Sequence, residues 1–148
     1  MMNKADADEK VEGGWLRVWL AFEVLAAQRE AAEGAIEELI GNLEKEDKAG
    51  VYGKELSDVR RIENPPLRGI KEAYSRVAKI ELVVKNMNAM LELVIKYGPS
   101  AIEILEPKKV ALQASDAQAL LNRVSEMMHM FASAGIGGLV FTRKQQGS

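Results

Sequence analysis

The sequence predicts an all-α fold, or an α fold with a minor β hairpin, on the basis of two observations. Apolar residues recur at alternating steps of three and four along extended segments, which is the spacing of helices that pack along a coiled-coil seam. The composition is 47% hydrophobic but only 5% aromatic, which suits helices better than sheets. We therefore expect a single helical domain over residues 1–148, with three helices of which the two longer ones pack antiparallel.

The first helix is predicted over residues 13–47, after a polar leader at residues 1–12 that we expect to be flexible. Its first half is apolar nearly all round, so it should be buried on more than one side. Residues 48–63 contain Gly50 and Gly53 and are predicted to be a linker. The residues that we expect at a helix-to-helix interface in this part of the chain are Trp15, Trp19 and Phe22.

The second helix is predicted over residues 64–98 and carries the most regular pattern in the sequence. Asn64-Pro65-Pro66 is a strong helix start, Gly98-Pro99 is a strong stop, and apolar residues fill the a and d positions of four heptads between them. At ~1.5 Å per residue this helix would span about 50 Å, so part of its seam should need a partner outside the chain. The interface residues expected on the seam are Ile70, Val77, Val84, Met87, Leu91 and Val94.

The last third of the chain changes pattern twice. Residues 99–113 alternate apolar and charged side chains and are predicted to form an extended or β arm. Ser115-Asp116-Ala117-Gln118 has the form of a capping box, so a third helix is predicted over residues 114–135. Residues 136–148 are expected to be a frayed tail.

Composition excludes several classes of protein. The chain contains no cysteine, which rules out disulfides, thiolate metal sites and a cysteine nucleophile. The N-terminus is polar and no run approaches the ~20 apolar residues of a membrane span, so a cytoplasmic location is expected. Basic residues at positions 54–79 are interleaved with acidic ones and are not accompanied by an aromatic platform for stacking, so nucleic acid is not an expected partner.

Two pairs of acidic residues suggest an enzymatic alternative. Glu30-x-x-Glu33 followed by Glu55-x-x-Asp58 resembles the paired acidic motif of MazG-type all-α nucleotide pyrophosphohydrolases. The resemblance implies that the four carboxylates hold Mg²⁺ against nucleotide phosphates. It covers residues 30–59 only, and Arg60-Arg61 stand where the family's apolar helix should continue. This departure argues against the second pair facing the first.

A second resemblance concerns the C-terminal part. The segment Lys96-Tyr-Gly-Pro-Ser-Ala-Ile-Glu-Ile-Leu-Glu-Pro107, followed by a helix that ends in a Met-His-Met stretch, is similar to short uncharacterised archaeal helical proteins. The similarity covers residues 96–131 and implies no activity.

Two other features have weak functional interpretations. Glu126 and His129 form the E-x-x-H step of di-iron bundles, but such sites need two steps and the chain has one histidine. The Trp-rich start of the first helix could lie at a membrane interface, although Glu12 and Glu23 flank it where basic residues are preferred. No metal or cofactor is therefore expected.

The leading hypothesis is a non-enzymatic helical interaction module that homo-oligomerises, with a dimer favoured and a further protein partner possible. The alternatives are a Mg²⁺-dependent nucleoside triphosphate pyrophosphohydrolase and a peripheral membrane protein. Neither catalytic nor cofactor-binding residues are predicted beyond the acidic pairs.

Overall fold

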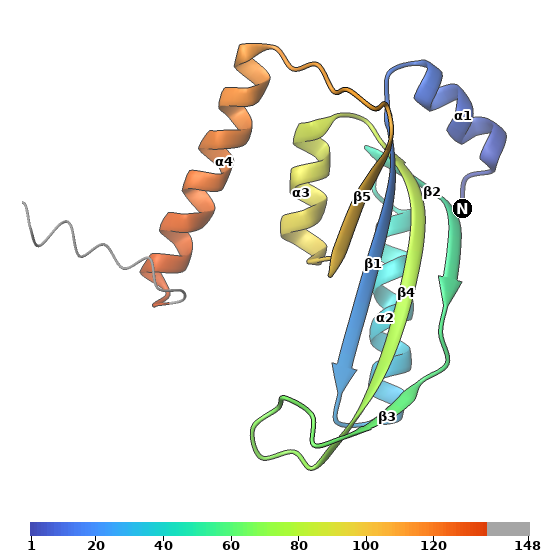
Figure 1. Ribbon diagram of the computed structural model, residues 1–148, viewed down its shortest axis with the longest axis vertical. Helices are drawn as coiled ribbons and strands as arrows, with labels where there is room; N and C mark the ends of the chain where they lie inside the picture. The colour runs from blue at the N-terminus through green and yellow to red at the C-terminus, as the bar shows by residue number, and fades with distance from the viewer. Residues whose placement is uncertain (136–148) are drawn as a thin grey trace, which may run out of the picture. The chain divides into compact units, whose positions relative to one another are not determined.

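The structure is a computed structural model that describes residues 1–135 (Figure 1). The chain divides into two compact units, Met1–Val110 and Ala111–Ser148. The tail predicted at residues 136–148 lies outside the described residues.

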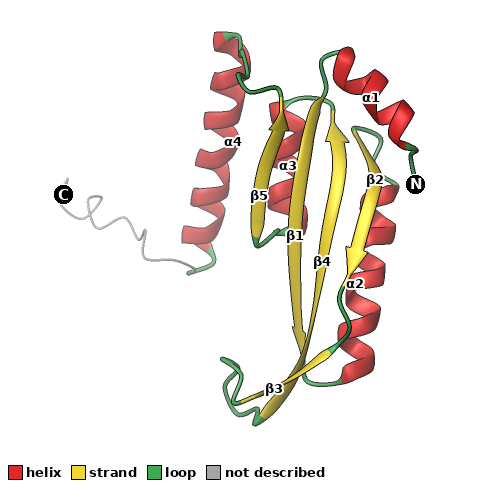
Figure 2. Cartoon of the chain, turned by 45° about the vertical axis from the view of Figure 1, so that its right-hand side comes forward, coloured by secondary structure: helices red, strands yellow, loops and turns green. Residues whose placement is uncertain are grey.

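The first unit is an antiparallel sheet with helices. Its strands run in the order β2-β4-β1-β5, and β3 pairs with the remaining part of β4 (Figure 2). Two long strands, β1 and β4, form the centre of the sheet, and they pair from Leu16↔Val84 to Ala26↔Tyr74. The elements are, in chain order, α1 (Lys4–Glu12), β1 (Leu16–Ala26), α2 (Arg29–Glu44), β2 (Ala49–Leu56), β3 (Arg60–Glu63), β4 (Glu72–Val84), α3 (Met87–Tyr97) and β5 (Ala101–Glu106).

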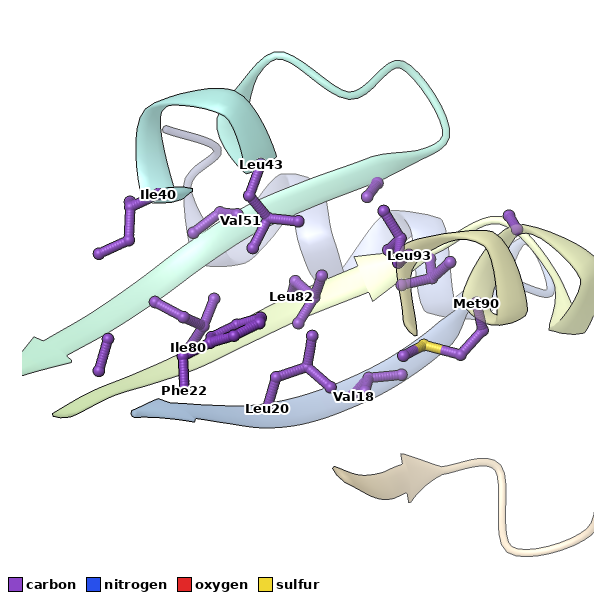
Figure 3. Packing of buried hydrophobic residues seen from close by; sticks show 14 of the residues in the cluster. Val18, Leu20, Phe22, Ile40, Leu43, Val51, Ile80, Leu82, Met90 and Leu93 are labelled. Atoms are coloured by element: carbon purple, nitrogen blue, oxygen red, sulfur yellow. The ribbon is translucent and has the colours of Figure 1, made fainter. Parts of the chain in front are cut away.

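The core lies between one face of the sheet and the two helices α2 and α3 (Figure 3). Successive side chains of a strand point to opposite faces, and alternate residues of both central strands point into this core. The buried core residues from the central strands are Leu16, Val18, Leu20, Phe22, Ala78, Ile80, Leu82 and Val84. The helices cover them with Ile36, Ile40, Leu43, Ala89, Met90 and Leu93.

The prediction of an all-α fold is wrong, because β1 and β4 occupy much of the two predicted long helices. In β4, Ala73 and Val77 lie on one face of the sheet, whereas Ile80 and Val84 lie on the other. The predicted heptad seam is therefore not a single stripe. Strand and heptad patterns overlap in this segment because Leu82, Val83 and Val84 are all buried, which hides the period-two alternation.

Helices form in the parts of these segments that follow the strands. α2 places Ala32, Ile36, Ile40 and Leu43 on one buried face, at helical spacing. α3 begins where the Asn86 side chain accepts a hydrogen bond from the Ala89 backbone N–H at 2.9 Å, and it ends at Gly98, whose φ is 59°. The predicted stop at Gly98 is thus confirmed. The predicted start at Asn64-Pro65-Pro66 is wrong, because those residues lie in the loop between β3 and β4.

Two shorter segments differ from the predictions, and a third, the predicted extended or β arm, agrees in part. The leader expected to be flexible contains α1, which begins where Asn3 Oδ1 accepts from the Asp6 backbone N–H at 2.8 Å. The expected linker at residues 48–63 forms β2 and β3. The arm at residues 99–113 contains one strand, β5, which pairs with β1 and not with a neighbouring strand of its own hairpin. A distant strand therefore stabilises β5.

The described part of the second unit is dominated by one helix, α4 (Ala114–Ser133). It lies within residues 114–135, where a helix was predicted. Its N-cap is Gln113 and no side chain caps it, so the predicted capping box at Ser115 is not formed. Within residues 1–135, no helix is long and apolar enough to cross a membrane.

Candidate interaction surface

The α4 helix carries a broad apolar stripe along its whole length. At ~100° per residue, the stripe occupies an arc of about 120°. None of the residues of α4 is buried, and the side chains of Leu121 and Phe131 are 71% and 41% exposed. A single helix cannot cover its own apolar side. We call it the α4 stripe and define it as Ala117, Leu120, Leu121, Val124, Met127, Met128 and Phe131.

The opposite side of α4 is polar and holds the E-x-x-H step. Glu126 lies 3.4 Å from the Arg123 guanidinium, an i,i+3 ion pair along the helix surface. Nowhere in the described residues do three or more histidine, aspartate or glutamate side chains come together as a metal site. Glu126 and His129 therefore do not belong to an assembled metal centre within residues 1–135.

The four carboxylates of the predicted magnesium site are not brought together. Glu30 and Glu33 lie near the start of α2, which packs on the core face of the sheet. Glu55 lies on β2 opposite Lys79, and this register points both side chains to the other face of the sheet. Asp58 follows in the segment between β2 and β3. The sheet thus separates Glu55 from the α2 pair.

The predicted interface residues are spread over several environments. Phe22 and Val84 belong to the buried core, and Met87 and Val94 pack against it. Leu91 is half-buried on α3, and Ile70 lies in the loop before β4. Three others lie away from the core: Trp15 precedes β1, and Trp19 and Val77 point to the sheet face opposite α2 and α3. The nine residues form no common surface in one chain.

Sequence reasoning did not single out the α4 stripe as an apolar surface, although the signal was present. The stripe has the same steps of three and four that were given weight at residues 15–43 and 70–94. The third helix was treated as a component of one shared core. Its separation as a second unit is a feature that the pattern alone does not reveal.

A surface hollow of about 740 Å³ lies between the ends of α2 and α3. Lys96 Nζ and Tyr97 Oη both donate to Glu46 Oε1, each at 2.6 Å. These hydrogen bonds, that from Lys96 foremost, hold the pKa of the Glu46 carboxyl below its usual range. Burial raises the pKa of Tyr97, and its bond to Glu46 adds to the effect. Glu46, Lys96 and Tyr97 are thus hydrogen-bonded to one another, and we call these three residues of the hollow's lining the Glu46 clamp. Its role is structural.

A second polar cluster, around Arg17, ties the first unit together. Arg17 lies 2.5 Å from Asp8 of α1 and 2.5 Å from Glu106 of β5, and its side chain is only 13% exposed. Its guanidinium also lies 5.3 Å from the ring centre of Tyr52. The Tyr52 hydroxyl and then Glu106 raise the pKa of Arg17. The cluster joins α1, β1, β2 and β5, which is a structural role.

Comparisons with known proteins place the chain in a family. The sequence model of the MJ0538 family matches residues 17–145, from β1 through α4. No curated protein and no solved structure matches the chain. The match fits the resemblance seen at residues 96–131 and extends far beyond it, whereas no comparison supports the likeness to MazG-type pyrophosphohydrolases. The chain belongs to the MJ0538 family.

Proposed function

We propose that this chain is a non-enzymatic protein–protein interaction module that binds its partner through the α4 stripe. The single observation that carries the proposal is that a 20-residue helix has an apolar side and no buried residue. The proposal retains the interaction role expected from the sequence. It moves the binding surface from the residues predicted between Trp15 and Val94 to α4.

The free energy of burying apolar side chains favours a state in which the α4 stripe is covered. A helix of this length is marginally stable in water without packing of its apolar side. Burying Leu121, which is 71% exposed, would contribute about 1–2 kcal/mol. The whole stripe would contribute roughly 5–10 kcal/mol before the costs of association are subtracted. Covering the stripe is therefore a favourable contribution to binding.

The charges of α4 favour a protein partner over a lipid surface. Helices that lie in a membrane interface carry many lysines and arginines on their polar side. Within α4 the charged residues are Asp116, Arg123 and Glu126, so acidic residues outnumber basic ones. An anionic membrane would repel this helix weakly, whereas a protein partner has no such requirement.

Site-specific photo-cross-linking in intact cells tests the proposal. A photoreactive residue replaces Leu121 on the stripe in one full-length variant, and Asn122, which lies on the opposite side, in the control variant. We expect cross-links to protein from position 121 and few from position 122. Equal cross-linking at both positions, or adducts to lipid alone, would contradict the proposal.

A further inference from the structure

We infer that α1 is a hinged strap that occupies a peptide-binding groove on its own sheet, and that an acidic helical segment of another protein takes its place when the strap opens. The groove lies within the first unit, on the sheet face opposite α2 and α3, where α1 packs against β2 and β4 (Figure 1). The inference therefore does not depend on the α4 stripe or on the proposed function.

The floor of the groove is one row of residues across three neighbouring strands. Arg17 of β1 and Gly50 of β2 both pair with Val83 of β4, which lies between them. Val83 is fully buried, and the Arg17 side chain is 13% exposed. Because Gly50 has no side chain, the row leaves a slot over β2. The groove thus offers an apolar slot at one end and a guanidinium group at the other.

The N-terminal segment fills this groove at three points. The Met2 side chain occupies the slot, where a Cβ atom at Gly50 would lie 2.4 Å from Met2 Cε. Ala7 is fully buried. The Asp8 carboxylate lies 2.5 Å from the Arg17 guanidinium. The segment is thus held as a bound peptide would be, through an apolar side chain, a small residue and a carboxylate.

The attachment of α1 is weak. Ala7 is the one buried residue of this nine-residue helix, and so short a helix is marginal by itself. Burial of the Ala7 methyl group favours the closed strap about fourfold, and partial burial of Met2 favours it about fivefold. The half-exposed ion pair of Asp8 adds about threefold. Closure is therefore favoured on the order of 50-fold at most, before the entropy cost of ordering the strap is subtracted.

Opening requires only a local change of the backbone. α1 ends at Glu12 and β1 begins at Leu16, with Gly13 and Gly14 between them. Gly14 has φ 103°, and no atom lies within 4 Å of the position that a Cβ would take there. Glycine changes between backbone conformations at little steric cost. The strap can therefore swing away while β1 keeps its place in the sheet.

The open groove keeps its preference for an acidic partner. Glu106 of β5 holds Arg17 Nε at 2.5 Å, and the ring centre of Tyr52 lies 5.3 Å from the guanidinium. Neither contact involves α1, so Arg17 stays oriented when Asp8 leaves. Its second amino group is then available for a charge-assisted hydrogen bond to another carboxylate. An apolar side chain six positions before that carboxylate would enter the slot over Gly50, as Met2 does.

Hydrogen–deuterium exchange of the full-length protein tests the strap. We expect the hydrogen-bonded amides of α1 to be protected about 50-fold and those of β1 and β4 far more strongly, because α1 opens without the sheet. Ala7→Glu should abolish the protection of α1 and leave that of the sheet unchanged. Ala5→Glu, the same substitution at an exposed position of α1, is the matched control and should change neither.

Three exchange results would overturn the inference. One is protection of α1 as strong as that of the sheet in the wild type, which would mean that α1 leaves only on global unfolding. Another is loss of protection in β1 and β4 on Ala7→Glu. The third is protection of α1 that Ala7→Glu does not reduce.

A fluorescent peptide with the sequence of residues 1–12 tests the groove by anisotropy. A short linker gives the strap an effective concentration on the order of 1 mM, so closure by about 50-fold corresponds to a Kd of about 20 µM for the free peptide. We expect this affinity for the full-length Ala7→Glu protein and about 50-fold weaker binding to the wild type, whose groove is filled. Asp8→Asn in the peptide should weaken binding about threefold, whereas Glu9→Gln, the control, should not. No binding to the Ala7→Glu protein at 1 mM, or equal binding to both proteins, would contradict the inference.

Protein concentration separates an outside partner from exchange of straps between copies. The strap of one chain closes on its own groove, so the protection of α1 should not depend on protein concentration. Protection that rises with concentration would assign the groove to the strap of a second copy and would overturn the inference. Failure of the cross-linking from position 121 would remove the proposed function and leave these results unchanged, because the groove and α1 lie in the first unit.

Discussion

Val77 and Ile80 are neighbouring apolar positions of the predicted heptad seam but lie on opposite faces of β4, so their truncation to alanine tests the sheet. Ile80 is fully buried in the core, whereas Val77 is half-buried on the other face. Ile80→Ala removes three buried carbons, worth about 2.4 kcal/mol at ~0.8 kcal/mol each, and leaves a cavity. We expect a total loss of about 3–4 kcal/mol. Val77→Ala removes two half-exposed carbons and should cost about 1 kcal/mol.

The assay is urea-induced unfolding of the full-length protein, followed by tryptophan fluorescence. Both tryptophans, Trp15 and Trp19, lie in the first unit, so the signal reports on the sheet. Wild type and variants are compared at one protein concentration, because association shifts apparent stability. The slope with urea should be unchanged while the midpoint falls. Equal losses for the two variants would refute the assignment of these residues to opposite faces.

Two other predictions follow from local geometry. Gly98→Ala should destabilise the first unit by about 1 kcal/mol, because residue 98 has φ 59°. Gly34→Ala, in the interior of α2 with open space around it, should instead stabilise the unit by about 0.5–1 kcal/mol. Both changes are measured from urea midpoints, and stabilisation by Gly98→Ala would contradict the left-handed cap. The lowered pKa of Glu46 means that its clamp stabilises the fold above the unfolded-state value near pH 4.5 and that this contribution is lost as pH falls through the lower folded value. The stability difference between wild type and Glu46→Gln should therefore be full at pH 7 and shrink below about pH 4. A difference that is independent of pH would show that the Glu46 charge does not matter.

The end of α3 at Gly98 was predicted correctly, although the helix before it was predicted to be much longer. The stop at Gly98 follows from residue chemistry that holds in any context, because a left-handed position favours glycine. Gly50 and Gly53 were interpreted as part of a linker, but both lie within β2. There Gly50 packs against the Met2 side chain, and Gly53 adjoins an irregularity in the pairing with β4. Glycine is needed at these two positions because of tertiary contacts, which the sequence pattern does not reveal.

The strand β1 was misassigned for a different reason. Its core face, Leu16, Val18, Leu20 and Phe22, alternates strictly. The intervening residues include Trp19 and Ala21, which are themselves apolar, so the period-two signal is weak and the segment also fits a helix. Arg17 is the polar exception, and it is held by ion pairs with Asp8 and Glu106 that no local pattern predicts.

Residue type distinguishes the helix α4 from the strand β4, although the spacing of apolar residues fits a helix in both. β4 has Val77, Ile80, Val83 and Val84, and such β-branched residues favour strands. In α4 the apolar positions are filled by leucine, methionine, alanine and phenylalanine, and Val124 is the single β-branched residue of that helix. Both segments fit a heptad, but only in α4 do spacing and intrinsic preference agree. The strictest heptad pattern, at residues 70–94, thus runs over a loop, β4 and α3, whereas the pattern in α4 lies on a single helix.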